Sequence, residues 1–202
     1  MKQESETKRK LLETAVEMIW ESSYGSVSVE DICTRAGVNK GSFYYAFKSK
    51  SDLAVAAFER HWEVKQPKMD QIFSLQLPAS ERLERYLQMV IDSQKEKFRS
   101  GGKMLGCPFC SVGSELSTQD ENIRKKAEQM TSRMIRYMES LVRDLAAEGL
   151  IESKDHYELA REVLFYITGV LIQAKIENSV DLVDRLPHGV KRLLNLKSLQ
   201  AT

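Results

Sequence analysis

Residues 28–53, SVEDICTRAGVNKGSFYYAFKSKSDL, contain the start and stop signals of two short helices placed close together. Ser28 followed three residues later by Asp31 is the pattern of a capped helix start. Gly37 suits the left-handed position that commonly ends a helix. A second short helix is then predicted from about residue 39 to 47. Two short helices joined by a glycine-containing turn form a helix-turn-helix, whose second helix lies in the major groove of DNA.

The charge of this stretch fits such a role. It has no acidic residue between Asp31 and Asp52, yet it holds four basic ones, Arg35, Lys40, Lys48 and Lys50. Phosphate contacts supply much of the affinity of DNA-binding proteins, so lysines beside an inserted helix and the exclusion of carboxylates favour DNA binding. The alternative is a solvated basic turn on an ordinary helical bundle, and spacing alone leaves both interpretations open.

The residues of this stretch divide into an apolar set and a polar set. The apolar set is expected to pack against a preceding helix whose stripe runs from Leu11 to Trp20, and its members are Val29, Ile32, Cys33, Ala36, Val38, Phe43 and Phe47. The residues left to face the groove are Asn39, Lys40, Ser42, Tyr44 and Tyr45.

The composition and the periodicity of the whole chain limit the possible fold classes. Of its 202 residues, 42% are hydrophobic and 29% charged, which is ordinary for a globular protein with a buried core. Helical periodicity extends along the chain, and no segment alternates as a half-buried strand would. The last predicted helix runs from about Val180 to Leu196 and is interrupted by Pro187. We therefore predict an all-α protein with two domains, residues 1–49 and 50–202.

Charge and hydropathy limit which partners and which cell compartment are possible. The net charge is only +1, so an anionic partner must be met by a local patch. The N-terminus has no apolar signal core, and the longest apolar run, residues 163–172, is far short of the roughly 20 residues that a membrane span needs. Three cysteines do not make a secreted disulfide framework. We expect a soluble cytoplasmic protein without a membrane partner.

Residues 7–53, TKRKLLETAVEMIWESSYGSVSVEDICTRAGVNKGSFYYAFKSKSDL, resemble the N-terminal domain of TetR-type transcriptional repressors. The resemblance implies a three-helix DNA-binding domain followed by a helical effector-binding and dimerisation bundle. Carried over by position, phosphate contacts fall on Lys40, Tyr44 and Lys48, and contacts to bases or backbone on Asn39, Gly41, Ser42 and Tyr45. Ser28 is a further candidate contact. Ala46 departs from the family, which often has histidine or tyrosine there, so a phosphate contact at this position is in doubt.

The resemblance also implies a homodimer built from the last two helices. Residues 161–176, REVLFYITGVLIQAKI, are apolar on nearly every face, which requires burial on two sides. Gly169 permits close approach of another helix, and the candidate interface residues are Tyr166, Gly169, Val170 and Val190. The alternative is a central core helix of a monomer.

Candidates for effector binding are fewer. Met130, Met134 and Met138 recur every four residues, and methionine-rich walls adapt to varied apolar ligands, so Met134 is a candidate, with core packing as the alternative. Gln94 interrupts an apolar helix face and is either a satisfied core amide or a polar anchor in a ligand cavity. The three histidines, His61, His156 and His188, lack ligand spacing and are expected at the surface.

The stretch LGCPFCSVG, residues 105–113, carries the remaining chemical signal. A zinc site lacks a second ligand pair, and a thioredoxin-like dithiol lacks flanking strands. Cys107 and Cys110 are therefore either small buried residues or sensors. The dipeptide GC, together with IQAKIENS at 172–179, resembles NemR-type repressors, which respond to electrophiles and oxidants. Pro108 predicts a helix start that places Cys107 beside the N-cap, and Lys175 is a further candidate sensing residue.

These observations lead to one functional prediction. The chain is expected to be a homodimeric DNA-binding regulator, most simply a repressor, released from operator DNA by a small apolar or electrophilic effector or by thiol modification. No cofactor or metal is expected, and no enzymatic activity. The alternatives are a thiol–disulfide redox protein using Cys107 and Cys110, and a constitutive DNA-binding architectural protein.

Overall fold

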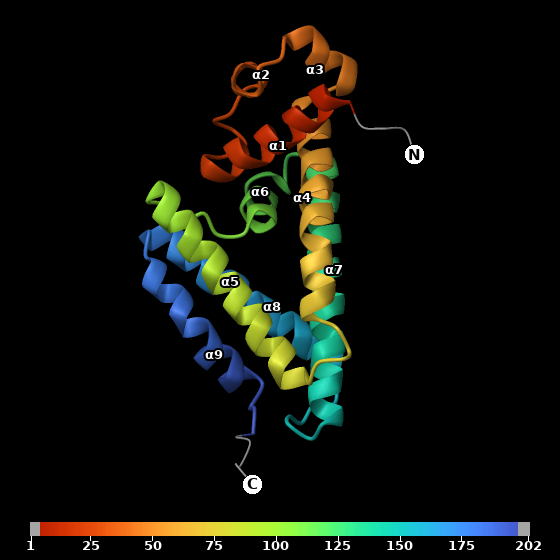
Figure 1. Cartoon of the computed structure of the whole chain (residues 1–202), viewed down its shortest axis with the longest axis vertical. Helices are drawn as coiled ribbons and strands as arrows, with labels where there is room; N and C mark the ends of the chain where they lie inside the picture. The colour runs from red at the N-terminus through yellow and green to blue at the C-terminus, as the bar shows by residue number, and fades with distance from the viewer. Residues whose placement is uncertain (1–4, 198–202) are drawn as a thin grey trace. The chain divides into compact units, whose positions relative to one another are not determined.

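The computed structural model describes residues 5–197, and every regular element within this range is helical, as the periodicity predicts. Figure 1 shows the helices in chain order. Their bounds are α1 Glu6–Glu21, α2 Val29–Ala36, α3 Lys40–Ala46, α4 Lys50–Ile72, α5 Ala79–Gly101, α6 Pro108–Leu116, α7 Glu121–Ala147, α8 His156–Glu177, the 3₁₀ helix η1 Val180–Arg185, and α9 Leu186–Leu193.

The chain forms two compact units. The first unit comprises the chain up to Gln66 together with Pro108–Met130, and the second comprises Pro67–Cys107 together with the chain from Thr131 onward. The helices α4 and α7 therefore each begin in the first unit and end in the second. The functional division at residues 49 and 50 stays a prediction.

The core of the first unit forms around α1. The apolar stripe of this helix packs against α2, α3 and α6, and Leu11, Ala15, Ile32 and Phe43 are completely shielded from solvent. Val112, Leu116 and Ile123 extend the same core into α6 and α7. The apolar set predicted from the sequence is thus the set that holds the three N-terminal helices together.

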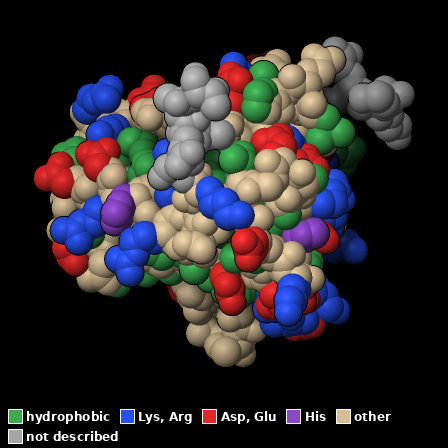
Figure 2. Space-filling view, turned by 90° about the horizontal axis from the view of Figure 1, so that it is seen from below, with side chains coloured by type: hydrophobic (Ala, Val, Ile, Leu, Met, Phe, Trp, Pro, Cys, Tyr) green, Lys and Arg blue, Asp and Glu red, His purple; other side chains and the backbone are tan. Residues whose placement is uncertain are grey.

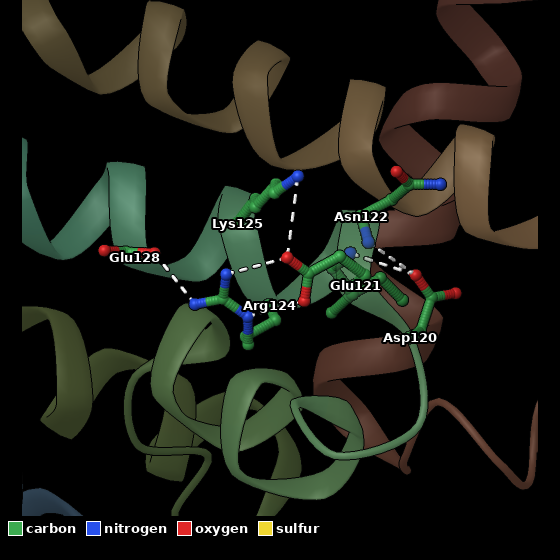
Figure 3. A network of polar contacts seen from close by, with 7 residues as sticks. Asp120, Glu121, Asn122, Arg124, Lys125 and Glu128 are labelled. Carbon is green, nitrogen blue, oxygen red and sulfur yellow. Dashed lines mark hydrogen bonds and ion pairs between the residues drawn. The ribbon is translucent and has the colours of Figure 1, made fainter.

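The start of α7, also in the first unit, is fixed by polar contacts (Figure 3). The carboxylate of Asp120 accepts hydrogen bonds from the backbone amides of Asn122, at 3.0 Å, and Ile123, at 3.1 Å, which caps the helix. Arg124 pairs with Glu121 on one side and with Glu128, one turn later, on the other. The hydrogen bond from Arg124 lowers the pKa of Glu121 to about 2.

The core of the second unit gathers α5, α8, η1 and α9 around buried aliphatic side chains, with the later part of α7. The helix expected from 180 to 196 with an interruption at Pro187 consists of the 3₁₀ helix η1 followed directly by α9, which ends at Leu193. Pro187 lies in the first turn of α9, because proline has no amide to continue the preceding helix but fits a helix start.

The surface carries mixed charge. On the face shown in Figure 2, acidic and basic side chains are interspersed with apolar and uncharged ones. None of the helices in the described range is long and apolar enough to cross a membrane.

Candidate functional site

The two helices of the predicted helix-turn-helix are capped by their own side chains. The hydroxyl of Ser28 accepts from the amide of Asp31, and the Asp31 carboxylate accepts from the amide of Ser28 at 2.8 Å, which completes a capping box. Gly37 ends α2 with φ of 66°. The side-chain oxygen of Asn39 then accepts from the amide of Ser42 at 2.7 Å and starts α3. The turn geometry predicted from the sequence is present.

The helix α3 has one buried and one exposed face. Phe43 is completely buried and contacts the rings of Tyr44 and Phe47, whereas the side chains of Tyr44 and Tyr45 are 60% and 95% exposed. Lys48 is exposed as well. A tyrosine ring that is 95% exposed contributes little to folding, so the exposed face of α3 is available for a partner.

Lys40, the first residue of α3, is held by a neighbour. Its ammonium lies 2.8 Å from a carboxylate oxygen of Glu30 on α2. The hydrogen bond that the Lys40 ammonium donates to this carboxylate raises the pKa of Lys40. Both side chains are more than half exposed, so an incoming phosphate can replace Glu30 at low cost.

The α1–α2 loop, residues 22–28, is joined to two later helices of the first unit. The carboxylate of Glu115 on α6 accepts from the backbone amides of Tyr24, at 3.1 Å, and Gly25, at 2.8 Å. The ammonium of Lys50, the first residue of α4, donates to the carbonyl of Tyr24 and lies 3.9 Å from the centre of its ring. Burial lowers the pKa of Lys50 and raises that of Tyr24. No local sequence signal indicates these contacts.

A second group of predicted residues meets around the connecting segment 102–107, between α5 and α6. Gln94 is buried, and its amide both donates to the carbonyl of Gly106 and accepts from its amide, each at 3.2 Å. Asn178 accepts from the amide of Met104 at 2.9 Å and donates to the carbonyl of Gly102 at 3.2 Å. Of the two roles considered for Gln94, this geometry is that of the core amide, and it fixes the residue before Cys107.

Lys175 passes close to the same segment. A Cβ placed on Gly106, whose φ is 69°, would lie 3.7 Å from the Cδ of Lys175 and 3.4 Å from the carbonyl oxygen of Leu171. Cys107 follows directly, is half-buried and packs against the core of the second unit. The structure therefore brings together Gln94, Lys175 and the backbone next to Cys107.

The other predicted sensing residues lie elsewhere. Cys110 is half-buried on α6, in the first unit, and Met134 is half-buried against the core of the second unit. The three cysteines, all within the described range, are not joined by a disulfide. His61 was expected at the surface, but it is half-buried and its ring packs edge-on against Trp20 and Phe109. No group of residues suited to hold a metal occurs in residues 5–197.

The predicted dimer residues divide between the inside and the outside of the second unit. Val190 is completely buried, so it has no surface to offer a partner, and the prediction that it lies at the interface is wrong. Tyr166 and Val170 are half-buried against the core. Gly169 is exposed with open space around it. Sequence reasoning missed three exposed apolar residues on the same face of α8, namely Phe165, Ile172 and Ile176.

The comparisons with known proteins match both halves of the chain. Residues 11–57 match the family described as bacterial regulatory proteins, tetR family, and residues 79–190 match the tetracyclin repressor-like C-terminal domain. Transcriptional regulator AcuR of Cereibacter sphaeroides is 29% identical over 83% of this chain and 75% of its own. The HTH-type transcriptional repressor NemR of Escherichia coli is 22% identical over 95% of each chain.

Solved structures agree in fold. The crystal structure of reduced NemR from E. coli superposes with a TM-score of 0.80 at 23% identity, covering 96% of this chain and 100% of that one. A TetR regulatory protein from Rhodobacter sphaeroides superposes with a TM-score of 0.82 at 26% identity, covering 94% and 99%. With an exposed α3 face on a capped helix-turn-helix and matches along both halves, the chain belongs to the TetR family of DNA-binding transcriptional regulators.

Proposed function

We propose that the chain is a cytoplasmic homodimeric repressor that an electrophilic or small apolar effector releases from its operator. The observation that carries the effector part is the fixed connecting segment 102–107, which ends at Cys107 and directly precedes α6. A chemical change at this cysteine would act on a segment held by four side-chain hydrogen bonds. Family membership supplies operator binding and dimerisation, and it excludes the alternative of a thiol–disulfide enzyme.

The DNA contacts follow from the exposed face of α3. Lys40, Tyr44 and Lys48 are proposed to bind phosphates, because they carry donors at or beside this face. Asn39, Gly41, Ser42 and Tyr45 are proposed to approach bases or backbone. A Cβ at Gly41 would lie 3.2 Å from the Asn39 side chain, so glycine keeps this end of α3 open. The hydroxyl of Ser28 is used within the capping box, so its contribution is to position α2.

The dimer interface is proposed on the exposed face of α8. Phe165, Gly169, Ile172 and Ile176 repeat at steps of four, three and four residues, which places them in one stripe along the helix. Leu193 on α9 adds further exposed apolar surface. Ile176→Asp should shift the sedimentation coefficient toward that of a monomer, because an unpaired charge would be desolvated in the contact. A wild type that sediments as a monomer at micromolar concentration contradicts the interface.

The thiol chemistry requires no cofactor. The sulfur of Cys107 loses its proton and adds to one carbon of an activated carbon–carbon double bond. The carbon–sulfur bond forms as the π bond breaks, and the neighbouring carbon takes up a proton in place of the one that the thiol lost. A nearby ammonium and a helix N-terminus both favour the thiolate that performs this attack. Lys175 lies next to Gly106, so it is the proposed cationic partner, and Met134 and Cys110 are secondary candidates for effector contact.

The test uses a duplex selected from a random-sequence pool by the full-length protein. Fluorescence anisotropy measures operator binding before and after treatment with N-ethylmaleimide. We expect the wild type to be released and Cys107→Ser to stay bound. Cys33 is 3% exposed, so it is a poor competitor for the reagent. Equal release of both proteins would show that Cys107 only packs and that the effector is not recognised through this thiol.

A further inference from the structure

The contact between α6 and the α1–α2 loop belongs entirely to the first unit, which contains the DNA-binding helices. The two helices α1 and α6 pack against each other (Figure 1). Glu115 is 90 and 91 residues away in sequence from the two loop residues whose amides it binds. It therefore joins the middle of the chain to the loop that leads directly into α2.

The two amides that Glu115 binds are consecutive in the chain, at Tyr24 and Gly25. Neither amide lies within a helix, and Tyr24 is half-buried, so its amide needs a side chain or water as its acceptor. Hydrogen bonds from backbone amides to a carboxylate are stronger than those between neutral groups. The carboxylate thus fixes the backbone of the loop at two neighbouring points.

Space and charge around the loop are adapted to this carboxylate. A Cβ on Gly25 would lie 3.2 Å from the Glu115 oxygen, so a side chain there would press on the contact. The ammonium of Lys50 binds the carbonyl of Tyr24 from the α4 side. The loop is consequently held by an anion on its amides and by a cation on its carbonyl, and both come from helices that follow the helix-turn-helix.

We propose that Glu115 is the positioning residue that holds the helix-turn-helix in its DNA-binding conformation, by binding the two consecutive amides of the α1–α2 loop. The inference rests on the operator binding of the proposed function and does not depend on the effector.

The test compares Glu115→Gln with Glu128→Gln. The control variant also removes one carboxylate from the first unit, but the side chain of Glu128 pairs with Arg124 at the start of α7. Loss of a negative charge alone strengthens or leaves unchanged the binding of DNA. A positioning role predicts the opposite for the specific complex, namely a Kd for the operator raised about tenfold in Glu115→Gln. Binding to a random duplex should not weaken, and Glu128→Gln should bind both duplexes like the wild type.

A second measurement separates positioning from general destabilisation. Hydrogen exchange at the amides of Tyr24 and Gly25 should accelerate in Glu115→Gln, while exchange in the α1 and α4 cores stays as in the wild type. If Glu115→Gln fails to fold, Glu115→Asp keeps the charge, shortens the side chain by one methylene and should show the same loss of operator affinity. Unchanged operator affinity and exchange in a folded variant overturn the proposal. A wild type without operator affinity would instead overturn the proposed function.

Discussion

Arg82 on α5 and Asp144 on α7 form an ion pair inside the second unit, with their charged atoms 2.8 Å apart. The arginine side chain is 3% exposed and the aspartate side chain 26% exposed. The two atoms in contact are the Nη1 of Arg82 and the Oδ2 of Asp144. Neither of them makes a hydrogen bond, and neither does the Nε of Arg82, so the contact is close but poorly aligned. This asymmetry of burial predicts an asymmetry in the effect of mutation.

Asp144→Ala leaves a buried guanidinium without its counter-ion, and we expect it to lower the free energy of unfolding by about 3–5 kcal/mol. Arg82→Met leaves a carboxylate that water can reach, and methionine fills the space with apolar atoms, so a loss of about 1–2 kcal/mol is expected. The double variant should recover much of the loss of Asp144→Ala, because no buried charge remains.

Urea unfolding at a fixed protein concentration measures these values, because the stability of a dimer depends on concentration. The control is Glu158→Ala, which removes the acid from an equally short but exposed pair with Arg161, where about 0–1 kcal/mol is expected. A larger loss in Arg82→Met than in Asp144→Ala would refute the reasoning, and so would a loss in Asp144→Ala no larger than in the control.

Three further predictions concern packing, charge and pH. Gly189→Ala should lower the free energy of unfolding by about 1–3 kcal/mol, because its Cβ would lie 1.7 Å from the hydroxyl of Tyr166; in a Tyr166→Ala background the same change should be neutral or stabilising, since alanine favours the helix. Glu30→Gln should lower the operator Kd by a few-fold in anisotropy titrations, because Lys40 no longer has to leave a carboxylate to reach phosphate; unchanged affinity would argue against a phosphate contact at Lys40. Burial and a hydrogen bond to a carboxylate raise the pKa of Tyr137 from 10.0 to about 12. The stability that this shift contributes is complete below pH 10 and is lost between about pH 10 and 12, as the hydroxyl loses its proton. Denaturant titrations should show that Tyr137→Phe lacks this loss.

Much of the fold could be predicted because its signals are local. The stripe of α1, the cap at Ser28 and the glycine at 37 each lie within one or two turns of the boundary that they specify. The division of α3 into buried Phe43 and exposed tyrosines also follows from position within a short helix. The interruption of the last helix at Pro187 was also predicted from a local signal, whereas the 3₁₀ geometry of its first part, Val180–Arg185, was not.

Contacts between distant residues had no such signal. Gln94 was recognised as unusual because it interrupts an apolar face, but its partner, the backbone of Gly106, could not be named. Asn178 and Glu115 look like ordinary polar residues on a helix end and a helix surface. Val190 was assigned to a partner because an apolar face looks the same in sequence whether it is covered by the chain itself or by a second copy.

The three side chains that sequence reasoning could not place share one chemical role. Gln94, Asn178 and Glu115 all bind backbone groups of segments that lie between helices. In a chain whose regular structure is helical throughout the described range, the backbone groups without intrahelical partners are concentrated in such segments. Each helix is held by many bonds of its own, whereas a connecting segment is held by a few side-chain bonds worth about 1–3 kcal/mol each. An effector with a modest difference in affinity between two states can therefore rearrange the connecting segments while the helices stay intact, and these side chains set how much binding energy that rearrangement requires.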